Sequence, residues 1–114
     1  MVTLEDTISS ISSLRTERFL KAQATLKKAV NILVRKYHVS KIILIGSLAD
    51  KERFGFHSDI DLCVEGLPDN LYFEAVGELL LITDEFDIDI IPFENVTPDM
   101  SVRIKNGNVI YEKR

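Results

Sequence analysis

The sequence predicts an α/β domain in which a small mixed β-sheet is backed by helices. The observations behind this prediction are a long helical pattern at residues 19–37 and three short strand-like runs at 41–45, 59–65 and 86–93. A second helical pattern, at about 71–84, separates the last two of these runs. Helices and strands therefore alternate along the chain, as they do when helices cover a sheet.

The first helix is predicted by apolar side chains that recur at a spacing close to 3.6 residues between Phe19 and Tyr37, with no glycine or proline between them. Residues 1–15 could form a helical extension of it, although six serines and threonines weaken that pattern. Its apolar side would carry Leu4, Ile8, Ile11 and Leu14. A length of 114 residues fits one domain, which we expect to span 1–114.

The strand-like runs differ in pattern. Residues 41–45 are almost wholly apolar, which is typical of a central strand buried on both faces. Residues 59–65 alternate, which places acidic side chains on one face and Ile60, Leu62 and Val64 on the other. In 86–93 the aspartates share one face, and Pro92 marks an edge or an end.

Two regions are less determined. Asp69 or Asn70 is expected to cap the helix at 71–84. The tail fits a hairpin around the pair Asn106-Gly107. It equally fits a helix at 98–105 followed by a final strand at 109–111.

Composition limits the partners. Fourteen basic residues against eighteen acidic ones give a net charge of -4, which argues against a direct nucleic-acid substrate. The single cysteine, Cys63, cannot form an internal disulfide, and a reducing compartment fits that. No run approaches the roughly 20 apolar residues of a membrane span. We expect a cytoplasmic protein.

Three carboxylates could form a metal site. Asp59 and Asp61 are two apart on a strand, so both project from one face. Asp89 lies in another strand, and pairing of the two strands would bring it within about 5 Å. Three acidic groups so close repel one another unless a cation neutralises them, and hard oxygen ligands suit Mg²⁺. Taken alone, an outward-facing Asp-x-Asp is more often a solvated face.

Gly46 and Ser47 could bind phosphate. They follow a buried strand and precede a short helical pattern at 48–53, where free backbone amides and the helix dipole attract anions. Glycine removes the side chain that would block a close approach, and the serine hydroxyl adds one donor. A triphosphate could then lie between these amides and a metal.

The order Ile45-Gly46-Ser47, then Ser58-Asp59-Ile60-Asp61-Leu62, then Phe86 to Phe93 resembles the signature of the polymerase-β nucleotidyltransferases, and over about 20–112 the chain is similar to their minimal members. That resemblance implies a two-metal site in which Asp59, Asp61 and Asp89 bind two Mg²⁺ ions, or Mn²⁺. Gly46 and Ser47 would bind the triphosphate of ATP. It also implies an antitoxin that transfers AMP to a hydroxyl of a HEPN-domain toxin.

The chain departs from relatives at one point. They often continue Gly-Ser with x-Ala-Arg-Gly, where this chain has Leu48-Ala49-Asp50-Lys51. Lys51 and Arg53 are candidates for the role of the missing arginine. The departure keeps a second hypothesis open, in which the protein is an antitoxin or binding module that acts by contact with its partner. A second copy of the chain could also build the acceptor site.

Overall fold

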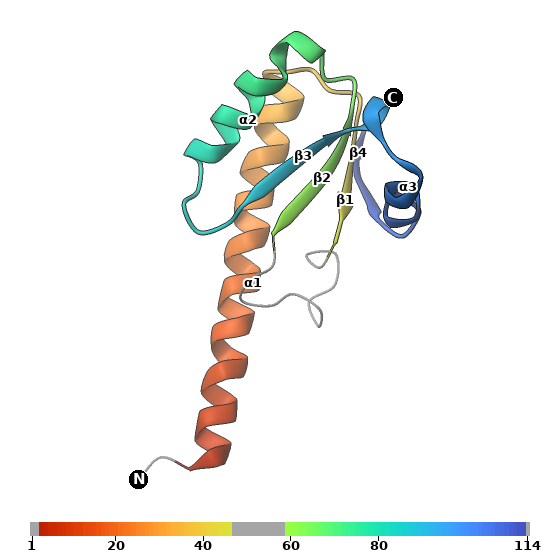
Figure 1. The fold of residues 1–114 in the computed structure, drawn as a ribbon. Helices are drawn as coiled ribbons and strands as arrows, with labels where there is room; N and C mark the ends of the chain where they lie inside the picture. The colour runs from red at the N-terminus through yellow and green to blue at the C-terminus, as the bar shows by residue number, and fades with distance from the viewer. Residues whose placement is uncertain (1–2, 47–58, 114) are drawn as a thin grey trace.

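The computed structural model describes residues 3–46 and 59–113, which form a four-stranded mixed sheet with helices on both faces (Figure 1). The predicted fold class is confirmed. The elements in chain order are α1 (Leu4–Arg35), β1 (Lys41–Ile45), β2 (Ile60–Glu65), α2 (Tyr72–Leu81), β3 (Ile88–Pro92), α3 (Pro98–Lys105) and β4 (Asn108–Glu112). Short 3₁₀ turns precede α2 and α3.

The strands lie in the order β3-β2-β1-β4. Strand β1 is antiparallel to both of its neighbours, while β2 and β3 are parallel and are joined by the crossover through α2. Four of the five β1 residues are buried, as expected for a strand covered on both faces. Strand β3 lies at the edge of the sheet and ends at Pro92, where a missing N–H costs no ladder hydrogen bond.

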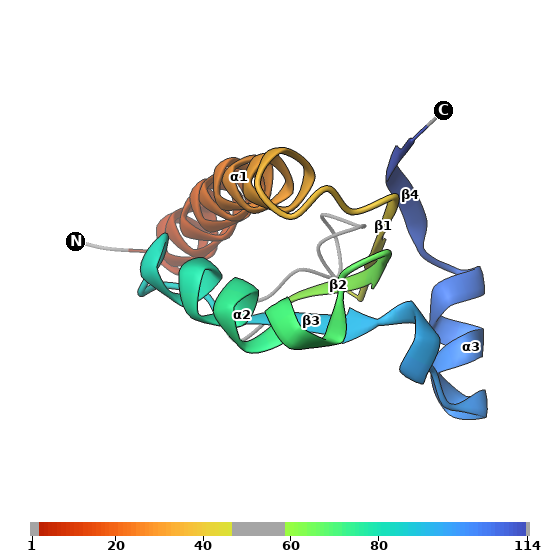
Figure 2. The same ribbon diagram turned by 90° about the horizontal axis from the view of Figure 1, so that it is seen from above.

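The two faces of the sheet carry separate cores. Helices α1 and α2 cover one face, and α3 lies on the other (Figure 2). The larger core joins α1 side chains such as Leu33 to Ile42, Leu62 and Leu79. The smaller core contains Ile43, Ile45 and Cys63, with Ile104 of α3 packed against it. The face of β2 that carries its aspartate is therefore partly covered by α3.

The tail forms the helical alternative, not the hairpin. Thr97 caps α3 by accepting a hydrogen bond from the backbone of Met100, and Pro98 occupies the first turn, where its missing N–H is harmless. Asn106 and Gly107 then end the helix, and β4 pairs with β1 rather than with a hairpin partner. Asn-Gly therefore serves here as a helix stop.

Three local expectations were wrong. Neither Asp69 nor Asn70 caps α2, because both lie in the 3₁₀ turn Asp69–Leu71 and no side chain caps the helix. The apolar patterns that predict the two helices include Leu20 and Leu80, but each of these side chains is 58% exposed. Helix α2 also ends three residues before Asp84.

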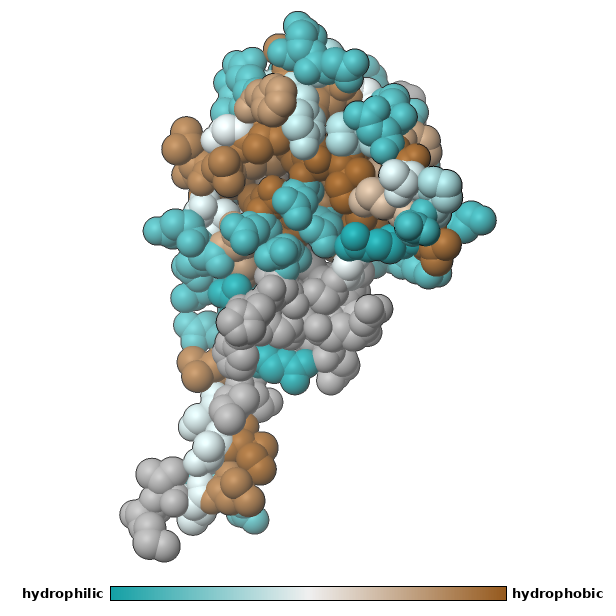
Figure 3. Space-filling model, in the orientation of Figure 1, coloured by the Kyte–Doolittle hydropathy of each residue, from teal (hydrophilic) through white to brown (hydrophobic). Residues whose placement is uncertain are grey.

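Helix α1 extends well beyond the sheet. Thr3 and Asp6 form a capping box at its start, and the helix runs unbroken for 32 residues, about 48 Å. Its N-terminal part projects away from the sheet (Figures 1 and 3) and exposes Leu4, Ile8 and Leu14. No helix in the described residues is both long and apolar enough to cross a membrane.

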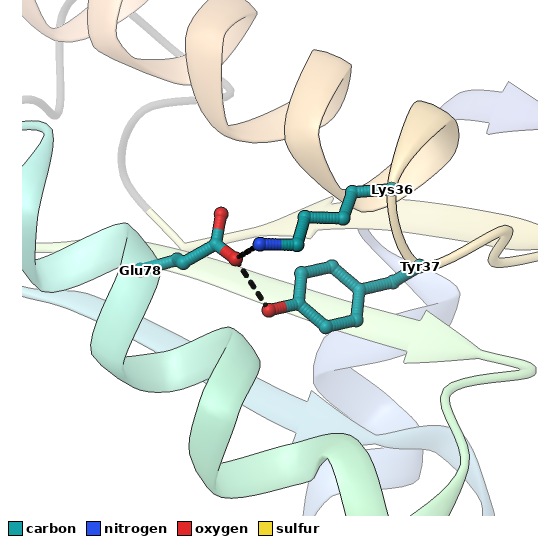
Figure 4. A network of polar contacts seen from close by, with 3 residues as sticks. All are labelled: Lys36, Tyr37 and Glu78. Atoms are coloured by element: carbon teal, nitrogen blue, oxygen red, sulfur yellow. Dashed lines mark hydrogen bonds and ion pairs between the residues drawn. The ribbon is translucent and has the colours of Figure 1, made fainter.

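The C-terminal end of α1 is fastened to α2 by a polar contact. The Tyr37 hydroxyl donates a 2.8 Å hydrogen bond to Oε1 of Glu78, and the Lys36 ammonium pairs with the same oxygen (Figure 4). The ammonium and the phenol both favour an ionised carboxylate, so they lower the pKa of Glu78. The contact fixes the position of α2 over the sheet.

This contact predicts a pH dependence. Burial, followed by the hydrogen bond to Glu78, raises the pKa of Tyr37 to about 12. The phenol of an unfolded chain ionises at about pH 10. Because the folded-state pKa is the higher one, the stabilisation is complete below about pH 10 and is lost as the pH approaches 12. An absorbance titration should show a tyrosinate appearing near pH 12 that Tyr37→Phe removes. A late ionisation that survives in this variant would contradict the assignment.

Candidate functional site

The predicted carboxylates lie on neighbouring strands. Asp61 of β2 and Asp89 of β3 are partners in the parallel register, so both side chains leave the same face of the sheet. Asp59 directly precedes β2 and is exposed, as is Asp89. The expectation that strand pairing brings Asp89 beside Asp61 is confirmed.

Asp87 occupies a different position. It lies just before β3, and its carbonyl oxygen accepts a 2.9 Å hydrogen bond from the backbone N–H of Ile60. Asp89, in contrast, is within the strand and level with Asp61. The register therefore favours Asp89 over Asp87 as the third carboxylate.

Asp61 is better shielded from solvent than Asp59 and Asp89, because its side chain is only 18% exposed. Burial is the main cause that raises its pKa, and the negative charges of Asp89 and Asp59 raise it further. The Arg103 guanidinium acts in the opposite direction. A carboxylate in these surroundings is stabilised by any cation that reaches it.

Gly46 forms the turn at the end of β1. Its φ of +84° lies in the left-handed region, which favours glycine. A Cβ atom at this position would lie 3.0 Å from Oδ2 of Asp61. The side-chain-free turn and the shielded carboxylate therefore face each other directly. The rest of the predicted phosphate loop, namely Ser47, the short helix at 48–53, Lys51 and Arg53, lies outside the described residues.

The donor chemistry fits a hard divalent cation, because Asp59, Asp61 and Asp89 offer only carboxylate oxygens. The side chains as they stand, however, do not form a ligand set. Among residues 3–46 and 59–113, no group of three or more His, Cys, Asp or Glu is close enough together to hold a metal ion. The backbone register places Asp61 and Asp89 side by side, and the carboxylates would need to change rotamer to converge on an ion.

Arg103 is the residue that the sequence did not reveal. It lies in α3, and its Nη2 donates to Oδ2 of Asp61 at 3.1 Å. Two features of the sequence could have pointed to Arg103: the lack of an arginine directly after Gly46-Ser47, and the possibility that the tail forms a helix. When the tail forms this helix, α3 lies over the face of β2 that carries Asp61.

Cys63 shares the face of Asp61 but has no part in the chemistry. It is 1% exposed and packs between Ile43 and Ile45 in the smaller core. Burial raises the pKa of its thiol, which disfavours the thiolate that a nucleophile requires. Cys63 is therefore a packed thiol of the smaller core.

The fold and the paired aspartates define a class of protein. The polymerase beta nucleotidyltransferase family profile matches residues 27–114, most of the chain. The chain belongs to this nucleotidyltransferase family.

Solved structures share the fold. A toxin–antitoxin complex crystallised with AMP-PNP is 19% identical over 76% of this chain and 73% of that one, with a TM-score of 0.61. The toxin–antitoxin complex MntA-HepT is 19% identical over 80% of this chain and 73% of that one, with a TM-score of 0.58. No curated protein matches the chain in sequence. At these identities the likeness establishes the fold.

Proposed function

We propose that the chain transfers AMP from ATP to a hydroxyl group of a partner protein. The observation that carries the proposal is the level pairing of Asp61 with Asp89 beside the open turn at Gly46. Membership of the nucleotidyltransferase family supports the reaction class. An AMP-PNP complex among the structures of the same fold supports an adenine nucleotide.

In this proposal Asp59, Asp61 and Asp89 hold two Mg²⁺ ions, which Mn²⁺ could replace. Gly46 and Ser47 bind the triphosphate. Divalent metals are in general use across the superfamily, and when bound they stabilise the entering and leaving oxygens of an in-line displacement. The acceptor hydroxyl loses its proton to solvent as its oxygen bonds to the α-phosphorus, the bond from the α-phosphorus to the oxygen that bridges it to the β-phosphate breaks, and pyrophosphate leaves.

The acceptor is proposed to be a HEPN-domain toxin. Asp59 and Asp89 are exposed, so the carboxylate face is accessible to another macromolecule. Productive transfer requires the hydroxyl to be held in line with the α-phosphorus, which can contribute about 7–11 kcal/mol. A docked partner supplies that orientation, and the solved structures of this fold are toxin–antitoxin complexes. The proposed use of ATP fits a cytoplasmic setting, and so does a single cysteine, which cannot form an internal disulfide.

A second function has an observation in its favour. The described carboxylates do not form a three-ligand cluster, and Asp61 is held by Arg103. An antitoxin that neutralises its toxin by contact alone would need no more than this fold. The two functions differ in whether the partner becomes covalently modified.

Intact-mass spectrometry of the partner tests the proposal. The chain is incubated with a candidate HEPN-domain partner, ATP and Mg²⁺. We expect mass increments of AMP on the partner, release of pyrophosphate, and no increment in EDTA. Asp59→Asn, which is isosteric, should remove the increments and leave the complex intact. A stable complex that gains no AMP would overturn the enzyme and leave the contact antitoxin.

A further inference from the structure

Arg103 makes the one cationic contact that the structure describes for Asp61. The Arg103 side chain is 49% exposed, whereas the side chain of Asp61, with which it pairs, is 18% exposed. The two residues are 42 positions apart in sequence and meet because α3 lies over the aspartate face of β2. The ion pair therefore lies at the opening of the site, between a shielded carboxylate and solvent.

The backbone beneath Arg103 is anchored. The next residue, Ile104, packs against the smaller core formed by Ile43, Ile45 and Cys63. Helix α3 ends two residues after Arg103, and β4 then pairs with β1. The start of the side chain is thus fixed relative to the sheet, while the half-exposed guanidinium retains freedom to adjust to a ligand.

The guanidinium also lies over the Gly46 turn. A Cβ atom at position 46 would lie 3.8 Å from Nη2 of Arg103 and 3.0 Å from Oδ2 of Asp61. The absence of a side chain at Gly46 therefore opens a space that an arginine borders. A planar guanidinium can bind two phosphate oxygens at once, in a bidentate geometry. It carries five N–H donors, and only one of its nitrogens, Nη2, donates to Asp61.

We infer that Arg103 binds the β- and γ-phosphates of the nucleotide at the Gly46 turn, an inference that rests on the proposed function. Before the nucleotide arrives, the guanidinium balances the charge of Asp61. With the nucleotide in place, it contacts the phosphates and leaves the carboxylate free to serve a metal. Arg103 thus supplies from α3 a positive charge in place of the arginine that relatives often carry at the position of Asp50.

The plain alternative is that this ion pair merely holds α3 against the sheet. The two readings differ in what Arg103→Gln does to different nucleotides. A phosphate-binding arginine contributes to ATP binding and hardly at all to AMP, which has no β- or γ-phosphate. A structural ion pair, in contrast, alters the melting temperature and leaves both nucleotide affinities unchanged.

Calorimetric titration with ATP and with AMP in Mg²⁺ separates the readings. We expect Arg103→Gln to weaken ATP binding about 10-fold or more and AMP binding less than about twofold. Arg103→Lys keeps the charge without the planar fork and should fall between the two. Lys105→Gln is the matched control, because it removes the same charge from an exposed position in the same helix.

The outcomes are distinguishable. If wild type transfers AMP and Arg103→Gln binds ATP as wild type does, the inference is overturned and the proposed function stands. If Lys105→Gln weakens ATP binding as much as Arg103→Gln, the effect is one of net charge and the inference is equally overturned. If wild type itself binds no ATP, the proposed function fails first. Should Arg103→Gln not fold, unchanged ATP affinity in Arg103→Lys overturns the inference.

Discussion

Replacing Asp89 with asparagine is expected to lower nucleotidyl transfer at least about 100-fold, whereas Asp87→Asn should change it by no more than about twofold. The two aspartates are separated by one residue in the same acidic segment. Only Asp89 lies within β3 and level with Asp61. Asn keeps the size and loses the charge, so the variant removes the proposed metal ligand without disturbing the strand. Asp87 contributes its backbone carbonyl to Ile60, which Asn preserves.

The measurement is the initial rate of AMP incorporation into the partner at saturating ATP and Mg²⁺. A second readout is the melting temperature with and without Mg²⁺. Wild type and Asp87→Asn should gain stability from the metal, because binding to the folded state stabilises it. Asp89→Asn should lose much of that gain. Equal rates in the two variants, or a greater loss in Asp87→Asn, would show that the third carboxylate is misassigned.

The sequence predicted the strands and their aspartates because both are local patterns. Alternation by two in β2 separates Asp61 from Leu62 whatever the rest of the chain does. The unbroken apolar run of β1 requires cover on both faces, and α3 supplies the second cover. Such patterns also fix which face of a strand an aspartate occupies. Once the two strands pair, their aspartates lie on the same face of the sheet.

Arg103 could not be found in this way. Its contact with Asp61 depends on the path of the chain after β3, and the tail pattern fitted both a hairpin and a helix. Asn106-Gly107 suits either, since both a type I′ turn and a helix end favour these residues. The structure resolves the ambiguity through β4, which completes the sheet beside β1.

The errors in α2 have a similar origin. Helical periodicity gives an apolar face but not its width, so Leu80 belongs to the apolar pattern of α2 although its side chain is 58% exposed. Exposed Phe73 and Leu81 lie on the same helix. The cap was misplaced because Asp69 and Asn70 favour a 3₁₀ turn as readily as an N-cap, and tertiary contacts decide between them.

The second large effect is expected for Gly46→Val, which should weaken ATP binding at least about 10-fold and lower the free energy of unfolding by about 1–3 kcal/mol. The stability loss follows from φ of +84°, a conformation that a β-branched residue strongly disfavours. The affinity loss follows from the new side chain, whose Cβ would lie 3.0 Å from the Asp61 carboxylate and occupy the approach of the phosphates.

Gly77→Ala provides the matched control for Gly46→Val. Gly77 lies within α2, and a Cβ atom there meets nothing within 4 Å. Alanine should therefore stabilise the protein by about 0.5–1 kcal/mol, since glycine loses more conformational freedom on folding, and ATP affinity should not change. Titrations well below both unfolding transitions separate affinity from stability. If Gly46→Val binds ATP as tightly as wild type while losing stability, the turn is an ordinary strand end, and the phosphates must bind elsewhere in the chain.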